Sequence, residues 1–152
     1  MSLWSQIKYA MNSTLGTSEF KPLDKIIEGQ RTWGAGEPTI KILRERFSSM
    51  SETELGTFTP KVGGSIRIAA NLVNTHASYA SSTATLYVYE GGTLISYTKA
   101  ESIANISVPF SMDIAITAGV KYTVTAKLDL SSNNRIVNAR VCGNLIDASL
   151  ME

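Results

Sequence analysis

The side chains best suited to nucleophilic chemistry are the lone histidine, His76, and the lone cysteine, Cys142. A cysteine nucleophile needs a histidine within hydrogen-bond reach and a third group that orients that histidine. The two residues lie far apart in sequence, and Cys142 follows an apolar strand-like segment of the kind that buries cysteine. We therefore expect a buried thiol and a solvated loop imidazole, not a catalytic pair.

The supply of metal ligands is equally small, because one histidine and one cysteine cannot make a zinc site from this chain. The segment 129–133, Asp-Leu-Ser-Ser-Asn, resembles the start of a calcium loop. However, Asn134 stands where such a loop needs glycine, and Arg140 stands where it needs a bidentate glutamate. A polar turn is the favoured interpretation, with calcium held by loops as the alternative. We predict no metal and no cofactor.

Glycoside hydrolysis requires two carboxylates that face each other across a cleft. Asp113, Glu90 and Glu101 lie on separate segments, and nothing in the sequence pairs them. We therefore predict that the chain is not an enzyme.

Three tyrosines, Tyr87, Tyr89 and Tyr97, lie on the two arms of an expected hairpin. Tyr87 and Tyr89 alternate with Leu86 and Val88, so they occupy the opposite face of one strand. Exposed tyrosines stack on sugars or pack against protein. Contact with another subunit or a covering segment is favoured, and a glycan platform is the alternative.

The elements that must position these side chains are strands. In the segment 106–116, six large apolar residues alternate strictly with small or polar ones, which predicts a strand with one buried face; they are Ile106, Val108, Phe110, Met112, Ile114 and Ile116. Further strands are predicted at 65–73, 84–89, 93–99, 122–130 and 135–142, with a loop at 74–82. The segment 39–47 predicts a first strand without a clear buried face, and 56–60 predicts a short edge strand because Pro60 cannot donate to a neighbouring strand. No helical crossover separates them. The fold class is therefore all-β, an antiparallel jelly-roll-like β-sandwich.

Residues 1–36 differ from the rest and predict a short N-terminal helical arm, followed by a sandwich domain over 37–152. Leu3, Ile7 and Met11 recur every four residues with Trp4 beside them, which is a helical apolar stripe. The arm either folds back on the sandwich or docks into a neighbouring protein. Docking is favoured because aromatic residues anchor interfaces, and its expected contacts are Leu3, Trp4, Ile7, Met11 and Phe20.

Composition excludes several partners. The 152 residues suit one domain, and a net charge of +1 gives no basic excess for nucleic acid. No apolar run is long enough to cross a membrane, and the first residues lack the pattern of a signal peptide. A single cysteine forms no intrachain disulfide. These features predict folding in a reducing cytoplasm.

The segment 6–25, Gln-Ile-Lys-Tyr-Ala-Met-Asn-Ser-Thr-Leu-Gly-Thr-Ser-Glu-Phe-Lys-Pro-Leu-Asp-Lys, resembles the N-terminal attachment segment of structural proteins in tailed phages and prophages of Gram-positive bacteria. The resemblance implies a non-enzymatic virion protein of tail, baseplate, fibre or head-decoration type, assembled in the host cytoplasm. Its implied partners are other virion proteins and further copies of itself, as a trimer or a ring. The alternative is a receptor-recognition module of a tail fibre or baseplate that binds a host surface glycan. The segment carries no catalytic residues.

Overall fold

The computed structural model describes residues 32–75, 81–103, 105–130, 132–144 and 148–152. The chain divides into two units, Met1–Thr32 and Trp33–Glu152. The sandwich unit thus begins at Trp33, whereas the sequence pattern placed the boundary between residues 36 and 37. The predicted helices and the predicted docking residues of the arm lie outside the described residues.

The described part of the sandwich contains eight strands and one short 3-10 helix. They are β1 (Thr39–Phe47), β2 (Thr53–Phe58), β3 (Gly64–Asn74), β4 (Ser82–Glu90), β5 (Thr93–Ser102), β6 (Ser107–Ile116), β7 (Tyr122–Leu128), β8 (Asn134–Cys142) and η1 (Ala148–Leu150). Among the described residues, no helix is long and apolar enough to cross a membrane.

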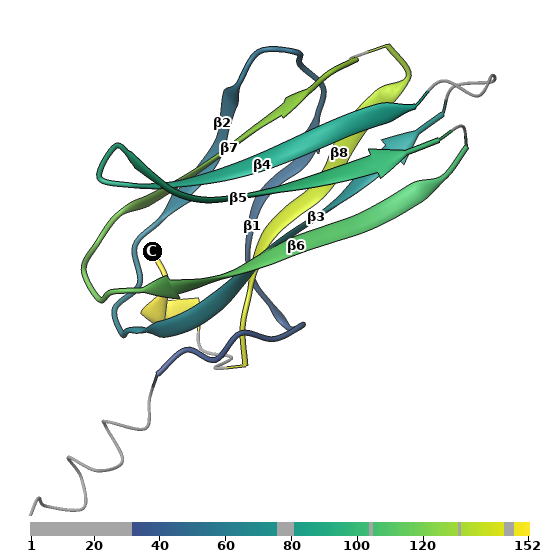
Figure 1. The fold of residues 1–152 in the computed structure, drawn as a ribbon. Coiled ribbons are helices and arrows are strands. Elements are labelled where there is room, and N and C mark those ends of the chain that lie inside the picture. The colour runs from purple at the N-terminus through teal and green to yellow at the C-terminus, as the bar shows by residue number, and fades with distance from the viewer. Residues whose placement is uncertain (1–31, 76–80, 104, 131, 145–147) are drawn as a thin grey trace, which may run out of the picture. The chain divides into compact units, whose positions relative to one another are not determined.

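The strands form two antiparallel four-stranded sheets, which Figure 1 shows as two layers. One sheet has the order β1-β8-β3-β6, and we call it sheet A. The other has the order β2-β7-β4-β5, and we call it sheet B. The chain changes sheet at most of its connections, and β4–β5 is the hairpin that stays within one sheet.

The core lies between the two sheets because each strand buries alternate residues. On β3, Ile66, Ile68 and Leu72 have no exposed surface, and on β4 the same holds for Leu86 and Val88. Full burial of one such side chain stabilises the fold by about 1.5–3 kcal/mol. Packing of these two rows against each other therefore accounts for much of what holds the sheets together.

The sixth strand follows its predicted alternation except at its start. Phe110, Met112, Ile114 and Ile116 are buried, and Val108 is partly buried. Ile106 is 42% exposed and lies before the strand, where its N–H donates to the carbonyl of Ile103. The prediction that Ile106 shares the buried face is wrong, because that residue closes the turn out of β5.

Several predicted boundaries also differ, among them the end of β5 at Ser102 and the end of β7 at Leu128. We expected a strand at 56–60, but β2 starts at Thr53 because its pairing with β7 begins opposite Ala126. Pro60 lies beyond β2 and forms an isolated bridge with Met151 instead. The expected loop at 74–82 loses both ends to strands: Asn74 and Ser82 are buried, and their side chains bond to the Ser102 carbonyl and the Asp129 carboxylate.

Candidate interaction surfaces

The exposed face of sheet B carries two tyrosines in direct register. Tyr87 on β4 is opposite Tyr97 on β5, and their ring centroids are 6.4 Å apart with a 36° tilt. Tyr97 is 59% exposed, and the Lys99 ammonium lies 5.9 Å from its ring centroid. We call Tyr87 and Tyr97 the tyrosine pair. It offers adjacent aromatic surface with a cation beside it.

Tyr89 lies on the same outer face, but a different contact holds it. Its hydroxyl donates to Glu52 Oε1, which also accepts a 2.6 Å hydrogen bond from Thr125 Oγ1. These bonds, first from Thr125 and then from Tyr89, lower the pKa of Glu52, and the charge of Lys127 acts in the same direction. The bond to Glu52 raises the pKa of Tyr89. The structure therefore separates the three predicted tyrosines into an open pair and one engaged phenol.

The other candidate residues are those that the sequence analysis considered for nucleophilic chemistry or metal binding. Cys142 is 1% exposed at the end of β8, so its thiol is buried, as expected. His76 lies outside the described residues. Asp129 accepts hydrogen bonds from the Thr83 N–H at 2.8 Å and from Ser82, so its carboxylate fastens the start of β4. Within the described ranges, no three His, Cys, Asp or Glu side chains form a metal-binding group.

A second surface lies where the sandwich unit begins, and sequence reasoning missed it. The N–H of Trp33 donates to the Gly63 carbonyl at 2.9 Å, and the Ser65 N–H donates to the Trp33 carbonyl at 2.7 Å. Trp33 thereby bridges Gly64 in parallel, and its side chain is only 2% exposed. We call the segment from Trp33 to Glu37, with the groups that hold it, the clasp.

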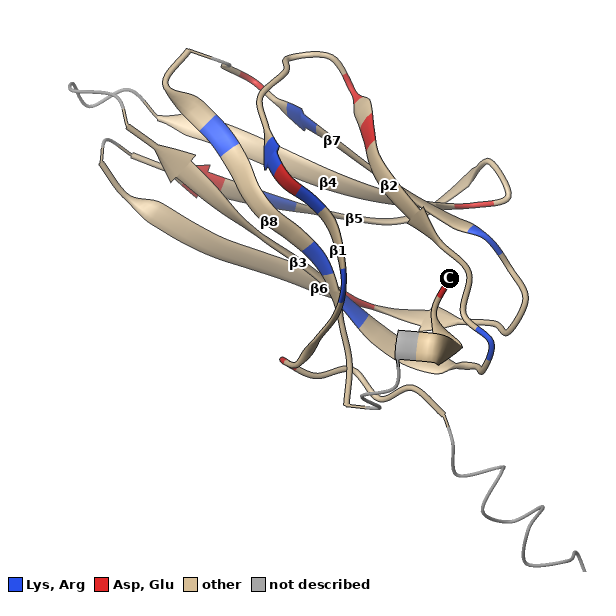
Figure 2. Ribbon diagram, turned by 180° about the vertical axis from the view of Figure 1, so that it is seen from behind, with Lys and Arg blue, Asp and Glu red and all other residues tan. Residues whose placement is uncertain are grey.

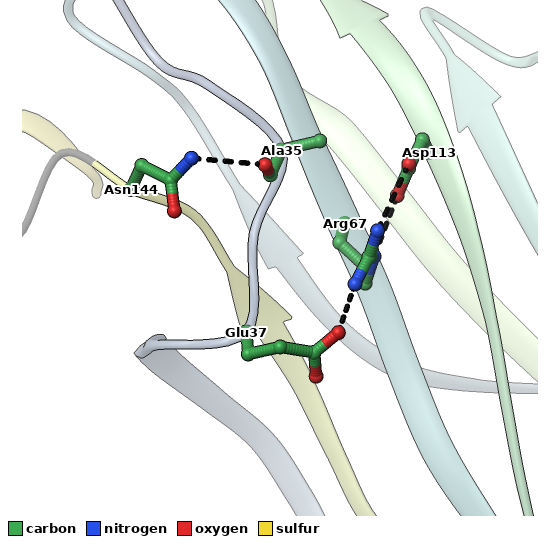
Figure 3. Close-up of polar contacts among 5 residues, drawn as sticks. All are labelled: Ala35, Glu37, Arg67, Asp113 and Asn144. Carbon is green, nitrogen blue, oxygen red and sulfur yellow. Dashed lines mark hydrogen bonds and ion pairs between the residues drawn. The ribbon is translucent and has the colours of Figure 1, made fainter.

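Asn144 holds the middle of the clasp, and Gly143 holds the residue after it, from the end of the last strand. Asn144 donates from its backbone to the Gly34 carbonyl at 2.7 Å and from Nδ2 to the Ala35 carbonyl at 3.1 Å. Gly143 donates to the Pro38 carbonyl at 2.9 Å. Figure 3 shows the Asn144–Ala35 bond, one of two that tie the clasp to the chain after β8. The Gly143 bond holds Pro38, the residue that follows the clasp.

An ion triad closes the clasp against sheet A. Arg67 on β3 donates from Nε and Nη2 to the two carboxylate oxygens of Asp113 on β6, at 2.8 and 3.2 Å. A third guanidinium nitrogen, Nη1, bonds to Glu37 of the clasp, as Figure 3 shows. The bonds from Arg67 lower the pKa of Asp113. Arg67 therefore connects β3, β6 and the clasp in one contact.

The sequence held two signals for this clasp. Arg67 and Asp113 both lie on the outward register of their strands, between apolar residues that face the core. The glycines and proline after Trp33 predict a loop, which is correct, but they say nothing of what the loop contacts. The contact depends on long-range register and is therefore invisible to a local pattern.

The two outer faces differ in charge. Figure 2 shows lysine and arginine on β1, β3 and β8 of sheet A, and acidic residues on β2 of sheet B. Arg46 on β1 is exposed, and Arg135 and Arg140 on β8 are partly exposed. More basic side chains therefore lie on sheet A than on sheet B, although Lys99 lies beside the tyrosine pair and Lys127 lies on β7.

Among family models, curated proteins and solved structures, only solved structures are similar to this chain. No protein-family model matches it, and no curated protein matches it. Two similar solved structures are each described as a pentameric capsid protein isolated from metagenomic phage sequences, at 20% and 17% identity. Both comparisons cover 95% of this chain and 93% of the other, with TM-scores of 0.37 and 0.41. TM-scores this low do not establish a shared fold, assembly or function.

Substitution at Gly64 tests the clasp. Gly64 has φ of +129°, and a Cβ there would overlap the Trp33 carbonyl oxygen and lie 2.7 Å from the Trp33 nitrogen. Gly119 has φ of +80° and no atom near the place of its Cβ. We expect Gly119→Ala to lower the free energy of unfolding by about 1–3 kcal/mol through backbone strain alone. Gly64→Ala should lower it by about 4 kcal/mol or more, measured by urea unfolding. Equal losses would mean that Trp33 moves aside freely.

Removal of the Arg67 charge tests the ion triad. The folded pKa of Asp113 is lowered from an ordinary 3.8, so its stabilising contribution is present above that pH and is lost as pH falls through the folded pKa. We expect Arg67→Met to raise the Asp113 pKa towards its ordinary value, measured by carbon-13 NMR of the carboxyl. Lys61→Met, which removes the 3.2 Å pair with Glu152, is the control and should leave Asp113 unchanged. An unshifted Asp113 titration in Arg67→Met would contradict the triad.

Proposed function

We propose that this chain is a non-enzymatic structural protein of a phage or phage-like particle. The arm, which precedes Trp33, docks onto another virion protein through Leu3, Trp4, Ile7, Met11 and Phe20. The sandwich projects from that attachment and assembles with further copies as a trimer or a ring. The strand order of sheets A and B suits a jelly roll, a fold of two Greek keys over eight strands.

The clasp is the observation that carries this proposal. An attachment segment transmits force to a domain best when the first residues of that domain are bonded to its strands. Trp33 is buried and bonded to the start of β3, and the ion triad holds Glu37. Tension on the preceding residues would therefore be passed to β3 and β6 instead of to a free loop. The resemblance of residues 6–25 to a phage attachment segment supplies the kind of partner.

Loss of the arm's apolar stripe tests the proposal. We expect Trp4→Ala with Ile7→Ala to reduce incorporation of the chain into particles by more than about tenfold, since buried anchors dominate docking. Incorporation is measured on purified particles by quantitative mass spectrometry. Folding of the sandwich is followed by fluorescence of Trp33, the tryptophan left in this variant.

The matched control is Ser5→Ala with Tyr9→Ala, which lie on the opposite side of the predicted helix. This control should enter particles at the level of the unaltered chain. Normal incorporation of the Trp4 and Ile7 variant, with Trp33 in its native environment, would sink the proposal.

The tyrosine pair supports a second candidate function, recognition of a host cell-wall glycan. Two adjacent rings on an exposed sheet can stack on a sugar. In that case, Tyr97→Ala should weaken glycan binding about tenfold. Tyr89→Phe, which removes only the hydroxyl bonded to Glu52, should leave binding unchanged. The measurement is calorimetry on any glycan found by a cell-wall panel, and no binding across the panel would count against this candidate.

A further inference from the structure

The two sheets leave four strand edges, and three of them carry features that discourage pairing with another chain. Bulges, proline, charged side chains and short length all blunt an exposed edge. β1 has two register shifts against β8 and carries Arg44 and Arg46. β6 contains Pro109, which has no N–H to donate. β2 has six residues and a register shift, and the chain from Leu150 to Glu152 bonds alongside its extension at Thr59 and Lys61.

β5 differs from these three because its charged side chains, Lys99 and Glu101, are opposite in sign, so two copies can pair without like charges opposed. It is an edge strand of ten residues that pairs within sheet B only with β4. Its one register shift lies near the hairpin, between Leu94 and Ser96, and the pairing from Ser96 to Ser102 is then uninterrupted. A regular edge of this kind is a template for strand addition. The outer half of β5 is therefore the open position in this fold.

The side chains of β5 indicate what would pair with it. Tyr97, Lys99 and Glu101 share the outward register and are all exposed. In an antiparallel pair within one sheet, residues that lie opposite each other point to the same face of the sheet. When the two strands are copies of one another, the two-fold axis therefore lies between one residue and the same residue of the other copy. Below, the register is named by that residue. An axis at Lys99 or Glu101 would set like charges opposite each other. An axis at Ala100 sets Lys99 of each copy opposite Glu101 of the other.

The Ala100 register also matches the apolar side chains. It brings Tyr97, which is 59% exposed, opposite Ile103 of the other copy, which is 49% exposed and lies just past the end of β5. Opposite charges and aromatic–aliphatic pairs are the cross-strand contacts that stabilise antiparallel sheets, while like charges destabilise them. Both kinds of contact occur twice because the register is two-fold.

We propose that two copies of this chain associate edge to edge through β5, with residues 98–102 of the two copies antiparallel and the two-fold axis at Ala100. The contact joins the two B sheets into one continuous sheet. It covers the outer edge of β5 and forms two Lys99–Glu101 pairs, while the Ser102 carbonyl keeps its hydrogen bond from Asn74 Nδ2. The proposal does not rest on a virion function, since it is drawn from the β5 edge alone, and it adds a two-fold contact to any contact that the arm makes.

Charge exchange at two positions tests the register. Lys99→Glu replaces each Lys99–Glu101 pair by two opposed carboxylates, and Glu101→Lys replaces each pair by two opposed ammonium groups. We expect either single variant of the full chain to self-associate at least about tenfold more weakly than the unaltered chain. A mixture of the two variants, and the double exchange within one chain, should both regain association because opposite charges face each other again.

The measurement is sedimentation equilibrium over a concentration series, with far-UV circular dichroism to confirm that each variant is folded. Lys121→Glu makes the same charge change at an exposed position outside β5 and should associate like the unaltered chain. A mass equal to that of one chain at every concentration would overturn the proposal. So would single variants that associate normally, or a mixture that fails to regain association while both variants are folded.

Discussion

Each strand of this sandwich can bury only one of its two faces, and the rest of the structure depends on that constraint. The alternation on β6, and on β3 apart from buried Ala69, gives one apolar row per strand, so a single sheet would leave that row in water. Two sheets packed face to face remove both rows from water at once. Two faces, four edges and the loops of the described sandwich remain outside the core, and any interaction through the sandwich must use one of these.

The clasp is a consequence of the same geometry. Because the inner register is filled by apolar side chains, Arg67 and Asp113 are both placed on the outer face of sheet A, directly opposite each other. Their pairing leaves one guanidinium nitrogen for Glu37, so a contact between two strands also holds the segment that precedes β1. Buried Trp33 adds the apolar part of that contact. A charged pair on a sheet surface contributes little to stability by itself. Here the pair orients the Arg67 guanidinium toward Glu37.

Sequence periodicity predicted most strands because alternation is a local property, and β1 was predicted at its observed bounds. It failed where partners far along the chain decide the outcome. Thr53 and Glu54 belong to β2 because they pair with β7. Asn74 and Ser82 were predicted in a polar loop, but they lie at strand ends and are buried, because their side chains bond to Ser102 and Asp129. The tyrosines were found by type and facing. Tyr89 differs from the tyrosine pair because its hydroxyl bonds to Glu52, which lies in the loop between β1 and β2.

Tyr97 belongs to two of the surfaces, since it is half of the tyrosine pair and lies on the β5 edge. A substitution there cannot distinguish a ring that stacks on a ligand from a ring that packs against a second copy. Lys99 and Glu101 separate these two roles, because in the Ala100 register their charges face each other across the edge, whereas a stacked ligand would contact the tyrosine rings. Strand pairing also leaves the outer face uncovered, since the added strand extends a sheet without covering it. A joined sheet would carry the tyrosine pair of each copy on the same side, so association through β5 and binding at the tyrosines are compatible, and the first would make the second bivalent.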